Sequence, residues 1–548
     1  MIAFDSGRRS RGGVAMAIAT LAALLALPAS AAAQLPNAGA DSLVRLGDVA
    51  AAESRHRAAI AVYERAIALD STRRAGLLPK LGRQYLWSDS PRHAARLFVE
   101  YLAIHPNSCE TRLDLGLAWS WADELDAARE TYDAVAAQCL YERGQARLGA
   151  ARALRWDNQF SSAERRYHEV LADGTDGDRE QAAIGLVYVR LARAEPRAAL
   201  ALADSLIAAG SRDPALTEAR VMALADLGAV GAAMESARSA QADGRGSTSL
   251  DRLTRGYAER ARPSFVAGVR GFRDRDGTSY RAADLGSAVA PLSLGTLRVT
   301  GRSAELRADG DSVSLRSREG EAALEIRPAA ALAIVGRAGV RDYDGVDFTP
   351  WEGELDLVWL PGDRRRVDVA AARIMLGDNV AAVQERLVGA FASIGLTERL
   401  TTGLSVAASV DGTRWSEGNT RMRARLSPRL ALEGVPVMTI EWPTIYQYYD
   451  EPFDFRLFSP KEYVETGPAF SVFKRAARVW YLSLYARGGG LRETGQGWQP
   501  LGIVRGSVER ELRSHWGLRV EGAWSNSNLA GSNGFERTTV AASVSIRP

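Results

Sequence analysis

The pattern of hydrophobic and polar residues divides the chain into two parts. From residue 40 to 243, apolar residues recur at helical spacing in segments that repeat about every 34 residues. From residue 263 onward, runs of roughly ten residues alternate between polar and apolar positions and are separated by turn residues. The pattern predicts an α + β multidomain protein, with a helical solenoid at 40–243, a polar linker at 244–262 and an antiparallel β-domain at 263–548.

The repeats of the first part share a Leu-Gly pair followed by a large aromatic residue. The clearest copies of the pair are Leu46-Gly47, Leu81-Gly82 and Leu115-Gly116. The aromatic residues at the matching positions are Tyr63, Phe98 and Tyr132. This frame resembles the tetratricopeptide repeat, and looser copies continue to residue 243, which gives about five to six repeats. The resemblance implies a right-handed solenoid whose concave face binds peptides or other proteins, and we expect the aromatic residues to pack between helices.

The strand-like runs of the second part carry charge on one face. In WEGELDLVW (351–359), Glu352, Glu354 and Asp356 share one face, and apolar residues flanked by Trp351 and Trp359 share the other. A soluble antiparallel sheet also alternates. The charged face and the aromatic residues at both ends favour a transmembrane β-barrel with water inside and lipid outside. The length of this part allows about 14 to 16 strands, and we prefer about 16. The number should be even if both ends of the barrel chain face the periplasm.

Arginines on the predicted strands are candidates for the lining of a pore. In NTRMRARLSP (419–428), arginines alternate with Met422, Ala424 and Leu426, which we expect to face lipid. The pore-lining candidates are Arg298, Arg302, Arg421, Arg423, Arg425 and Arg519. Two interpretations stay open. The arginines attract an anionic polymer and suppress cation flow, or they pair with lumenal carboxylates such as Glu352, Glu354 and Asp356 and stiffen the barrel.

The first 33 residues have the features of a secretory signal peptide. Arg8, Arg9 and Arg11 precede an apolar run at 14–27, and small residues suited to cleavage end at Ala33. The run is too short for a comfortable membrane span. We therefore expect an exported protein of the cell outer membrane, with its repeats in the periplasm.

The chain has two cysteines, Cys109 and Cys139. An oxidising compartment permits a disulfide between them. In the repeat frame they lie at neighbouring ends of one antiparallel helix pair. A disulfide that closes this pair is one hypothesis, and two buried free thiols are the other.

Composition and motifs exclude several function classes. The formal net charge of the 548 residues is +3, which argues against a dedicated nucleic-acid-binding protein. The five histidines lack metal-ligand spacing, and neither a nucleophile elbow nor a P-loop is present. The glycine-rich RGGGLRETGQG (487–497) is interpreted as a loop. We expect no enzymatic activity, no catalytic residue, no metal and no cofactor.

A short motif connects the second part to a known group of barrels. The residues of FSPKEY that carry it are Phe458, Ser459, Pro460 and Tyr463. The segment resembles one in the barrels of the outer-membrane component of bacterial cellulose synthase, and the layout is similar to poly-N-acetylglucosamine exporters and YaiO-like proteins. The resemblance implies an outer-membrane pore that exports an exopolysaccharide. The chain departs from the usual barrel pattern because it ends in SVSIRP without a terminal aromatic residue. The alternative function is a non-conducting anchor and assembly scaffold that presents the repeats to periplasmic partners.

Overall fold

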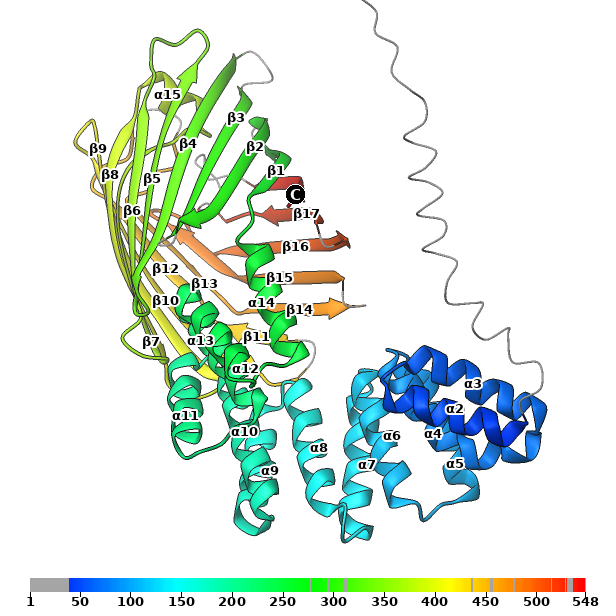
Figure 1. The fold of residues 1–548 in the computed structure, drawn as a ribbon. Coiled ribbons are helices and arrows are strands. Elements are labelled where there is room, and N and C mark those ends of the chain that lie inside the picture. The colour runs from blue at the N-terminus through cyan, green and yellow to red at the C-terminus, as the bar shows by residue number, and fades with distance from the viewer. Residues whose placement is uncertain are drawn as a thin grey trace, which may run out of the picture. The chain divides into compact units, whose positions relative to one another are not determined.

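The structure is a computed structural model. It describes residues 39–547 except 276, 293–294, 309–312, 435–436, 454–456, 477–478, 514, 528 and 530–535, so the predicted signal peptide lies outside the described residues. The chain forms two compact units (Figure 1). The first contains the described residues up to Trp156 together with Arg165–Arg179, and the second contains Asp157–Glu164 and the chain from Glu180 onward.

The repeat region is entirely helical. Its helices are α2 (Ala40–Ala52), α3 (His56–Leu69), α4 (Arg74–Trp87), α5 (Pro91–Ile104), α6 (Cys109–Trp121), α7 (Leu125–Gln138), α8 (Arg143–Trp156), α9 (Phe160–Asp173), α10 (Asp176–Ala192), α11 (Pro196–Ala208), α12 (Pro214–Asp226) and α13 (Val230–Ala242), with a 3₁₀ turn at Ser71–Arg73. Among the residues that the structure describes, no helix combines the length and hydrophobicity that spanning a bilayer requires.

Glycine allows the two helices of each clear repeat to approach closely. A Cβ atom on Gly47 would lie 2.5 Å from the ring of Tyr63, and one on Gly82 would lie 2.5 Å from the ring of Phe98. Gly116 has the same relation to Tyr132 at 2.7 Å. The aromatic rings are buried, as the repeat frame predicts. Each Leu-Gly pair therefore marks the contact between two antiparallel helices.

The range predicted as a linker contains a further helix, α14 (Thr248–Arg260). Its N-terminus is capped by Ser247, whose side-chain oxygen accepts a hydrogen bond from the backbone N–H of Leu250 at 2.9 Å. Leu250 is fully buried against α12 and α13, and Leu253 and Tyr257 pack beside it. The polar composition of 244–262 concealed this helix because only three large apolar side chains form its buried face.

The second part is one closed antiparallel sheet. Its segments are β1 (Ser264–Asp274), β2 (Ser279–Leu292), β3 (Gly295–Ala308), β4 (Val313–Ala329), β5 (Leu332–Tyr343), β6 (Trp351–Trp359), β7 (Arg365–Met375), β8 (Val388–Arg399), β9 (Leu404–Trp415), β10 (Thr420–Leu432), β11 (Val437–Glu441), β12 (Thr444–Tyr449), β13 (Glu462–Thr466), β14 (Ala469–Ala476), β15 (Trp480–Glu493), β16 (Gln499–Arg513), β17 (Trp516–Ser525) and β18 (Arg537–Ile546). The sheet closes because β1 pairs with β18 as well as with β2.

The segments form 16 barrel strands, as the sequence predicts. Two strands are each interrupted once, β11 and β12 being halves of one strand and β13 and β14 halves of the next. The interruptions fall at Pro443 and Pro468, which cannot donate a backbone hydrogen bond to the ladder.

The glycine-rich sequence 487–497 is not the loop that its composition suggests. Residues up to Glu493 belong to β15. A Cβ atom on Gly489 would lie 2.1 Å from the carbonyl oxygen of Thr466, and one on Gly467 would lie 2.1 Å from that of Gly488. The glycines thus allow β15 to approach the interrupted strand closely.

The two ends of the barrel differ in their connections. At the end where β1 begins, strands are joined by short turns, for example from Ala329 to Leu332 and from Leu432 to Val437. The other end carries the longer connections Met375–Val388, Tyr449–Glu462 and Ser525–Arg537. We call these the short-turn end and the long-loop end.

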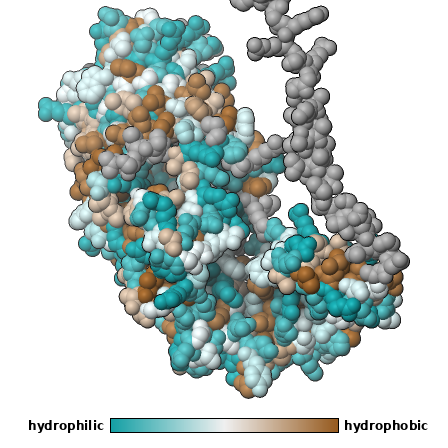
Figure 2. Space-filling model, viewed as in Figure 1, coloured by the Kyte–Doolittle hydropathy of each residue, from teal (hydrophilic) through white to brown (hydrophobic). Residues whose placement is uncertain are grey.

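The outer face of the barrel is apolar in its middle. Large exposed side chains such as Leu285, Val299 and Val340 lie at outward positions, and their strand neighbours point inward. Met422 and Leu426 are 52% and 51% exposed, which agrees with the predicted lipid-facing side of their strand. Apolar side chains gather on the visible wall below a hydrophilic upper end (Figure 2). This is the surface of an outer-membrane β-barrel.

Candidate functional site: the barrel lumen

Six inward-facing residues with alternating charge cross the inner wall from β1 to β6. They are Arg270, Asp284, Arg302, Glu319, Arg341 and Glu352, and we call them the charge ladder. Successive members are in direct contact. Arg302, for example, lies 2.5 Å from Asp284 and 2.8 Å from Glu319. Each charge has a neighbour of opposite sign on the next strand, so this part of the lumen has little net charge.

The predicted pore-lining arginines fall into two groups. Three have carboxylate partners. Arg302 belongs to the charge ladder, Arg421 lies 2.8 Å from Asp411, and Arg519 pairs with Glu521. Arg423 instead donates to the amide oxygen of Gln447 at 2.7 Å. Arg298 and Arg425 are exposed and have no carboxylate partner among the residues that the structure describes.

The carboxylates that the sequence offered as partners bind other arginines. Glu352 pairs with Arg341, and Glu354 and Asp356 pair with Arg337. Arg270, Arg337 and Arg341 therefore belong to the inner wall although the sequence pattern did not single them out. Which carboxylate each of them meets depends on strand register, which the sequence does not show. That Arg337 and Arg341 point inward could have been predicted, because side chains alternate between the two faces along β5.

A segment at the long-loop end folds into the barrel. The segment 376–387, which we call the plug segment, contains the short helix α15 (Val380–Gln384). Val380 and Val383 pack against inward-facing residues of β3, β4 and β5, namely Leu306, Leu315 and Tyr343. Ala382 and Val383 are fully buried. The plug segment therefore occupies the interior of the barrel near this end.

Polar contacts tie the plug segment to the wall. Asp378 lies 2.9 Å from Arg537 of β18, which also forms a buried ion pair with Asp274 of β1 at 2.7 Å. A Cβ atom on Gly377 would lie 1.4 Å from a guanidinium nitrogen of Arg341 in the charge ladder. These contacts hold the plug segment against the same strands that carry the ladder.

The motif FSPKEY shapes a second inward-folded connection. Ser459 is buried, and its hydroxyl accepts from the backbone N–H of Phe453 at 2.8 Å and donates to the carbonyl of Leu457 at 3.1 Å. Leu457 packs in one cluster with Ala382 and Leu387 of the plug segment. Phe458 packs edge-on against Tyr463 with ring centroids 5.5 Å apart, and Pro460 lies between them in sequence. The motif thus brings this loop against the plug segment.

Tyr463 of the motif belongs to a buried polar network. The carboxylate of Glu465 accepts hydrogen bonds from Tyr463 at 2.9 Å, from Ser527 at 2.5 Å and from Arg487 at 2.6 Å. Arg487 also donates to the carbonyl oxygen of Pro443 at 2.8 Å. The network therefore supplies hydrogen-bond partners for the Glu465 carboxylate and for both terminal nitrogens of Arg487 at the site where prolines interrupt the strands.

The lumen towards the short-turn end contains a cavity of about 430 Å³. Its charged lining residues are Arg429, Arg505, Arg519 and Glu521, and six residues with hydroxyl groups also line it: Thr439, Ser471, Ser483, Tyr485, Ser507 and Thr539. Arg505 lies over the ring of Tyr485 at 5.7 Å. The lining of this cavity therefore contains three arginines and one glutamate, unlike the charge ladder, in which the two signs are equal in number.

Barrel turns at the short-turn end cap two helices within the second unit. Asp363, between β6 and β7, accepts hydrogen bonds from the backbone N–H groups of Arg197 at 3.1 Å and Ala198 at 2.9 Å, at the start of α11. Glu433, between β10 and β11, accepts from the backbone N–H of Ser161 at 3.1 Å, at the start of α9. Both carboxylates lie at the positive end of a helix dipole.

Tryptophan residues end the first helices of three successive repeats in the first unit. They are Trp87, Trp121 and Trp156. Trp87 is 56% exposed and contacts Trp121 edge-on at 5.2 Å between ring centroids. The spacing of these residues matches the repeat period and was readable from the sequence, but the frame defined by the Leu-Gly pairs does not include them.

The two cysteines are joined in the structure. Cys109 and Cys139 form a disulfide with Cα atoms 6.0 Å apart, at the start of α6 and directly after α7. Glu142 lies close enough to complete a three-ligand group with the two sulfur atoms. Because the sulfur atoms are bonded to each other, they are not thiolate ligands in this state.

Comparisons with known proteins find similarity in structure but not in sequence. No family profile and no curated protein matches the sequence. A structure described as a bacterial polysaccharide outer membrane secretin is similar over 53% of this chain and 99% of its own, with 14% identity and a TM-score of 0.44. A tetratricopeptide repeat protein from Parabacteroides merdae covers 40% of this chain and 86% of its own, with 16% identity and a TM-score of 0.33. CdiB from Acinetobacter baumannii covers 52% of this chain and 60% of its own, with 10% identity and a TM-score of 0.33.

Proposed function

We propose that this protein is a non-enzymatic outer-membrane pore that exports a carbohydrate polymer and is closed at rest by the plug segment. The observation that carries the proposal is the polar lumen of a closed 16-stranded barrel, lined by the charge ladder and by the arginine-rich cavity. Guanidinium, carboxylate and hydroxyl groups can exchange hydrogen bonds with the hydroxyls of a polymer that slides past them. This role requires no covalent bond to be made or broken.

The proposed orientation places the short-turn end and the repeats in the periplasm. Bacterial outer-membrane barrels have short periplasmic turns and longer extracellular loops. Here α14 leads directly into β1 at the short-turn end, and α9 and α11 are capped by turns of that end. The plug segment would then close the extracellular side.

The balance of charge in the lumen bears on the type of polymer. The charge ladder neutralises itself, so it offers no strong field to a highly charged chain. The cavity towards the short-turn end has an excess of arginine, which favours a neutral or weakly anionic polymer over a cationic one. The exposed tryptophans at the ends of α4 and α8 add aromatic surfaces of the kind on which the apolar faces of sugar rings stack.

Planar-bilayer recording tests the pore. We expect the full-length protein to conduct weakly and the variant Val383→Asp to conduct several-fold more. Val383 is fully buried between the plug segment and the wall, and a carboxylate there would expel the segment. Gln384→Asp places the same group on the exposed side of α15 and should leave conductance unchanged. Clear cation selectivity of the opened variant would contradict the polymer type proposed here.

Tryptophan fluorescence of the full-length protein tests whether it binds carbohydrate. The ligands are soluble β-linked oligosaccharides of glucose or N-acetylglucosamine. Binding should shift the emission of the wild type and be lost in Trp87→Ala. Trp498→Ala removes another exposed tryptophan, from the loop between β15 and β16, and should leave binding intact. Equal binding by both variants would refute a role for the repeat tryptophans.

The buried plug segment also supports a second candidate, a barrel that never opens and only anchors the repeats. Deletion of residues 379–385 separates the two. A pore should then conduct at a steady level, whereas an anchor whose interior is blocked by other side chains should stay silent. A silent deletion variant that still folds would favour the anchor.

A further inference from the structure

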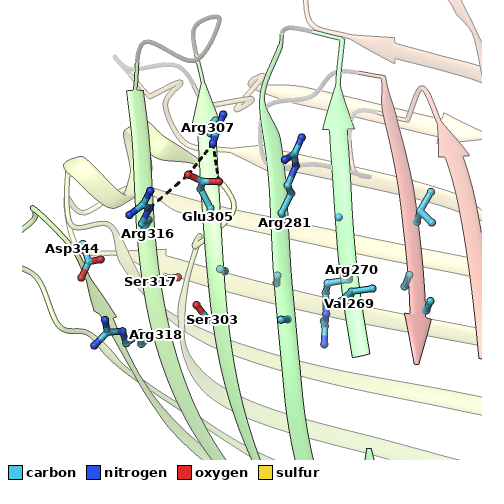
Figure 3. Close-up of a pocket in the computed structure, with 17 residues that line it drawn as sticks. Val269, Arg270, Arg281, Ser303, Glu305, Arg307, Arg316, Ser317, Arg318 and Asp344 are labelled. Atoms are coloured by element: carbon cyan, nitrogen blue, oxygen red, sulfur yellow. Dashed lines mark hydrogen bonds and ion pairs between the residues drawn. The ribbon is translucent and has the colours of Figure 1, made fainter. Parts of the chain in front are cut away.

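The outer wall near the long-loop end carries a group of charged side chains where a membrane barrel is otherwise apolar. On β2 and β3, Leu285 and Val299 are exposed on the outer face of the barrel, and Arg281 and Glu305 occupy outward positions further along the same strands. Arg316 and Arg318 occupy outward positions on β4. Arg281, Glu305, Arg307, Arg316 and Arg318 are called the rim cluster, and Figure 3 shows their side chains on neighbouring strands.

Strand register fixes the order of charges in the rim cluster. Glu305 is directly opposite Arg281 on one side and Arg316 on the other. Because neighbouring strands are about 4.8 Å apart, the two arginines flank the carboxylate at about 10 Å from one another at the backbone. Glu305 pairs with Arg307 at 3.0 Å and with Arg316 at 3.7 Å, as the dashed lines in Figure 3 show.

Glu305 does not neutralise the rim cluster. Arg281 and Arg318 are exposed and have no ion-pair partner among the described residues, and the side chain of Arg316 is 72% exposed. Among the described residues, two further carboxylates lie beside the cluster on β5 and directly after it: Asp342, opposite Arg318, and Asp344, both exposed at the long-loop end. Among the described residues, the cluster and these two aspartates together comprise four arginines and three carboxylates, so a small positive excess remains.

The outer wall has a depression between the arginines of the rim cluster. Small outward residues, including Gly271, Ala283 and Ser303, leave a depression of about 810 Å³ on the wall, and the arginines stand around it. An arginine on the lipid side of a barrel is strongly destabilising at the midplane of the membrane and nearly neutral close to the interface. The cluster therefore belongs at headgroup depth, where an anion can fill the depression.

We propose that the rim cluster binds the phosphate groups of an anionic lipid headgroup in the leaflet at the long-loop end. Guanidinium groups bind phosphate oxygens in pairs of parallel hydrogen bonds, and several arginines around one depression suit a headgroup with two phosphates. The proposed membrane orientation decides only the leaflet, which would be the outer one. The binding itself is a property of the folded barrel and does not depend on export.

Native mass spectrometry of the full-length protein in mild detergent tests this inference. The probes are bisphosphorylated lipid A, its dephosphorylated form and inorganic phosphate, each added at the same concentration. We expect the bisphosphorylated lipid to bind, the dephosphorylated lipid to bind at least tenfold more weakly, and inorganic phosphate not to compete at millimolar concentration. The triple variant Arg281→Ser, Arg316→Ser, Arg318→Ser should lose at least tenfold in affinity for the bisphosphorylated lipid.

Arg510→Ser is the matched control. Arg510 is an exposed outward arginine near the short-turn end, where it lies over the ring of Trp480 at 4.8 Å. Its loss should not change lipid binding. Equal affinity of the triple variant and the wild type would overturn the proposal, as would effective competition by inorganic phosphate, which would indicate a site for free anions. Heat-modifiable migration on gels shows whether each variant barrel is folded. The lipid-binding result does not depend on the conductance experiment, so a failure of the proposed export function would leave it unaffected.

Discussion

Glu465 and Arg487 form an ion pair inside the wall of the barrel, 2.6 Å apart, with side chains 2% and 3% exposed. The pair lies where Pro443 interrupts one strand and where the glycine-rich part of β15 passes close to the next. It also connects to Tyr463 of the FSPKEY motif. The motif residue Tyr463 thus contacts both the wall where a proline interrupts it and the loop that packs against the plug segment.

Glu465→Gln should destabilise the barrel strongly. The amide keeps the shape of the side chain but leaves the Arg487 charge buried without a counter-charge, which costs about 3 to 5 kcal/mol. The measurement is the temperature at which the folded barrel band disappears on a gel of samples heated in steps. Glu462→Gln, an exposed position on the same strand, is the control. Equal melting of the two variants would show that the pair contributes nothing.

Asp363→Ala should loosen α11 without opening the barrel. The change removes an acceptor for two backbone N–H groups at the start of the helix, and loss of such a cap costs about 0.5 to 2 kcal/mol. Hydrogen exchange of the full-length protein should then be faster in residues 196–208 than in the wild type. Asp347→Ala, in the exposed loop between β5 and β6, should leave α11 unchanged. Unaltered exchange in α11 would exclude a role for this contact.

The sequence predicted those features that depend on local periodicity. The helical repeats and the inward position of Arg421 follow from residue spacing, and the length of the second part limits the number of strands to about 14 to 16. The partners of the arginines do not, because Arg302 meets Glu319 only through the register between β3 and β4. The cap that Asp363 provides for α11 was equally inaccessible, because Asp363 and Arg197 are 166 residues apart in the chain.

Short or weakly amphipathic elements escaped prediction for a different reason. The helix α15 has five residues, too few to show a helical period, and its burial comes from the surrounding strands. The glycines at 488–490 resemble a loop in composition, yet their lack of a side chain is what permits β15 to pass close to Thr466. Tertiary contacts decide the structure in both places.

Gly82→Ala should destabilise the repeats, although alanine favours a helix. A Cβ atom at this position would meet the buried ring of Phe98, and such overpacking costs about 1 to 3 kcal/mol. Gly76 lies in the same helix, α4, with nothing within 4 Å of an added Cβ, so Gly76→Ala should instead stabilise by up to about 1 kcal/mol. Helical circular dichroism during heating measures both. If the two variants shift the transition in the same direction, the proposed close contact is wrong.

The disulfide between Cys109 and Cys139 should stabilise the first unit of the repeats. It closes a loop with a sequence separation of 30, and cross-links of this size contribute about 2 to 4 kcal/mol, chiefly by restricting the unfolded chain. Replacing both residues by serine should therefore lower the thermal transition of the helices but leave the barrel transition unchanged. Mass measurement after alkylation without reductant should show no modified cysteine in the wild type. Two alkylated cysteines in the exported protein would mean that the thiols are free, and the stability difference should then vanish under non-reducing conditions.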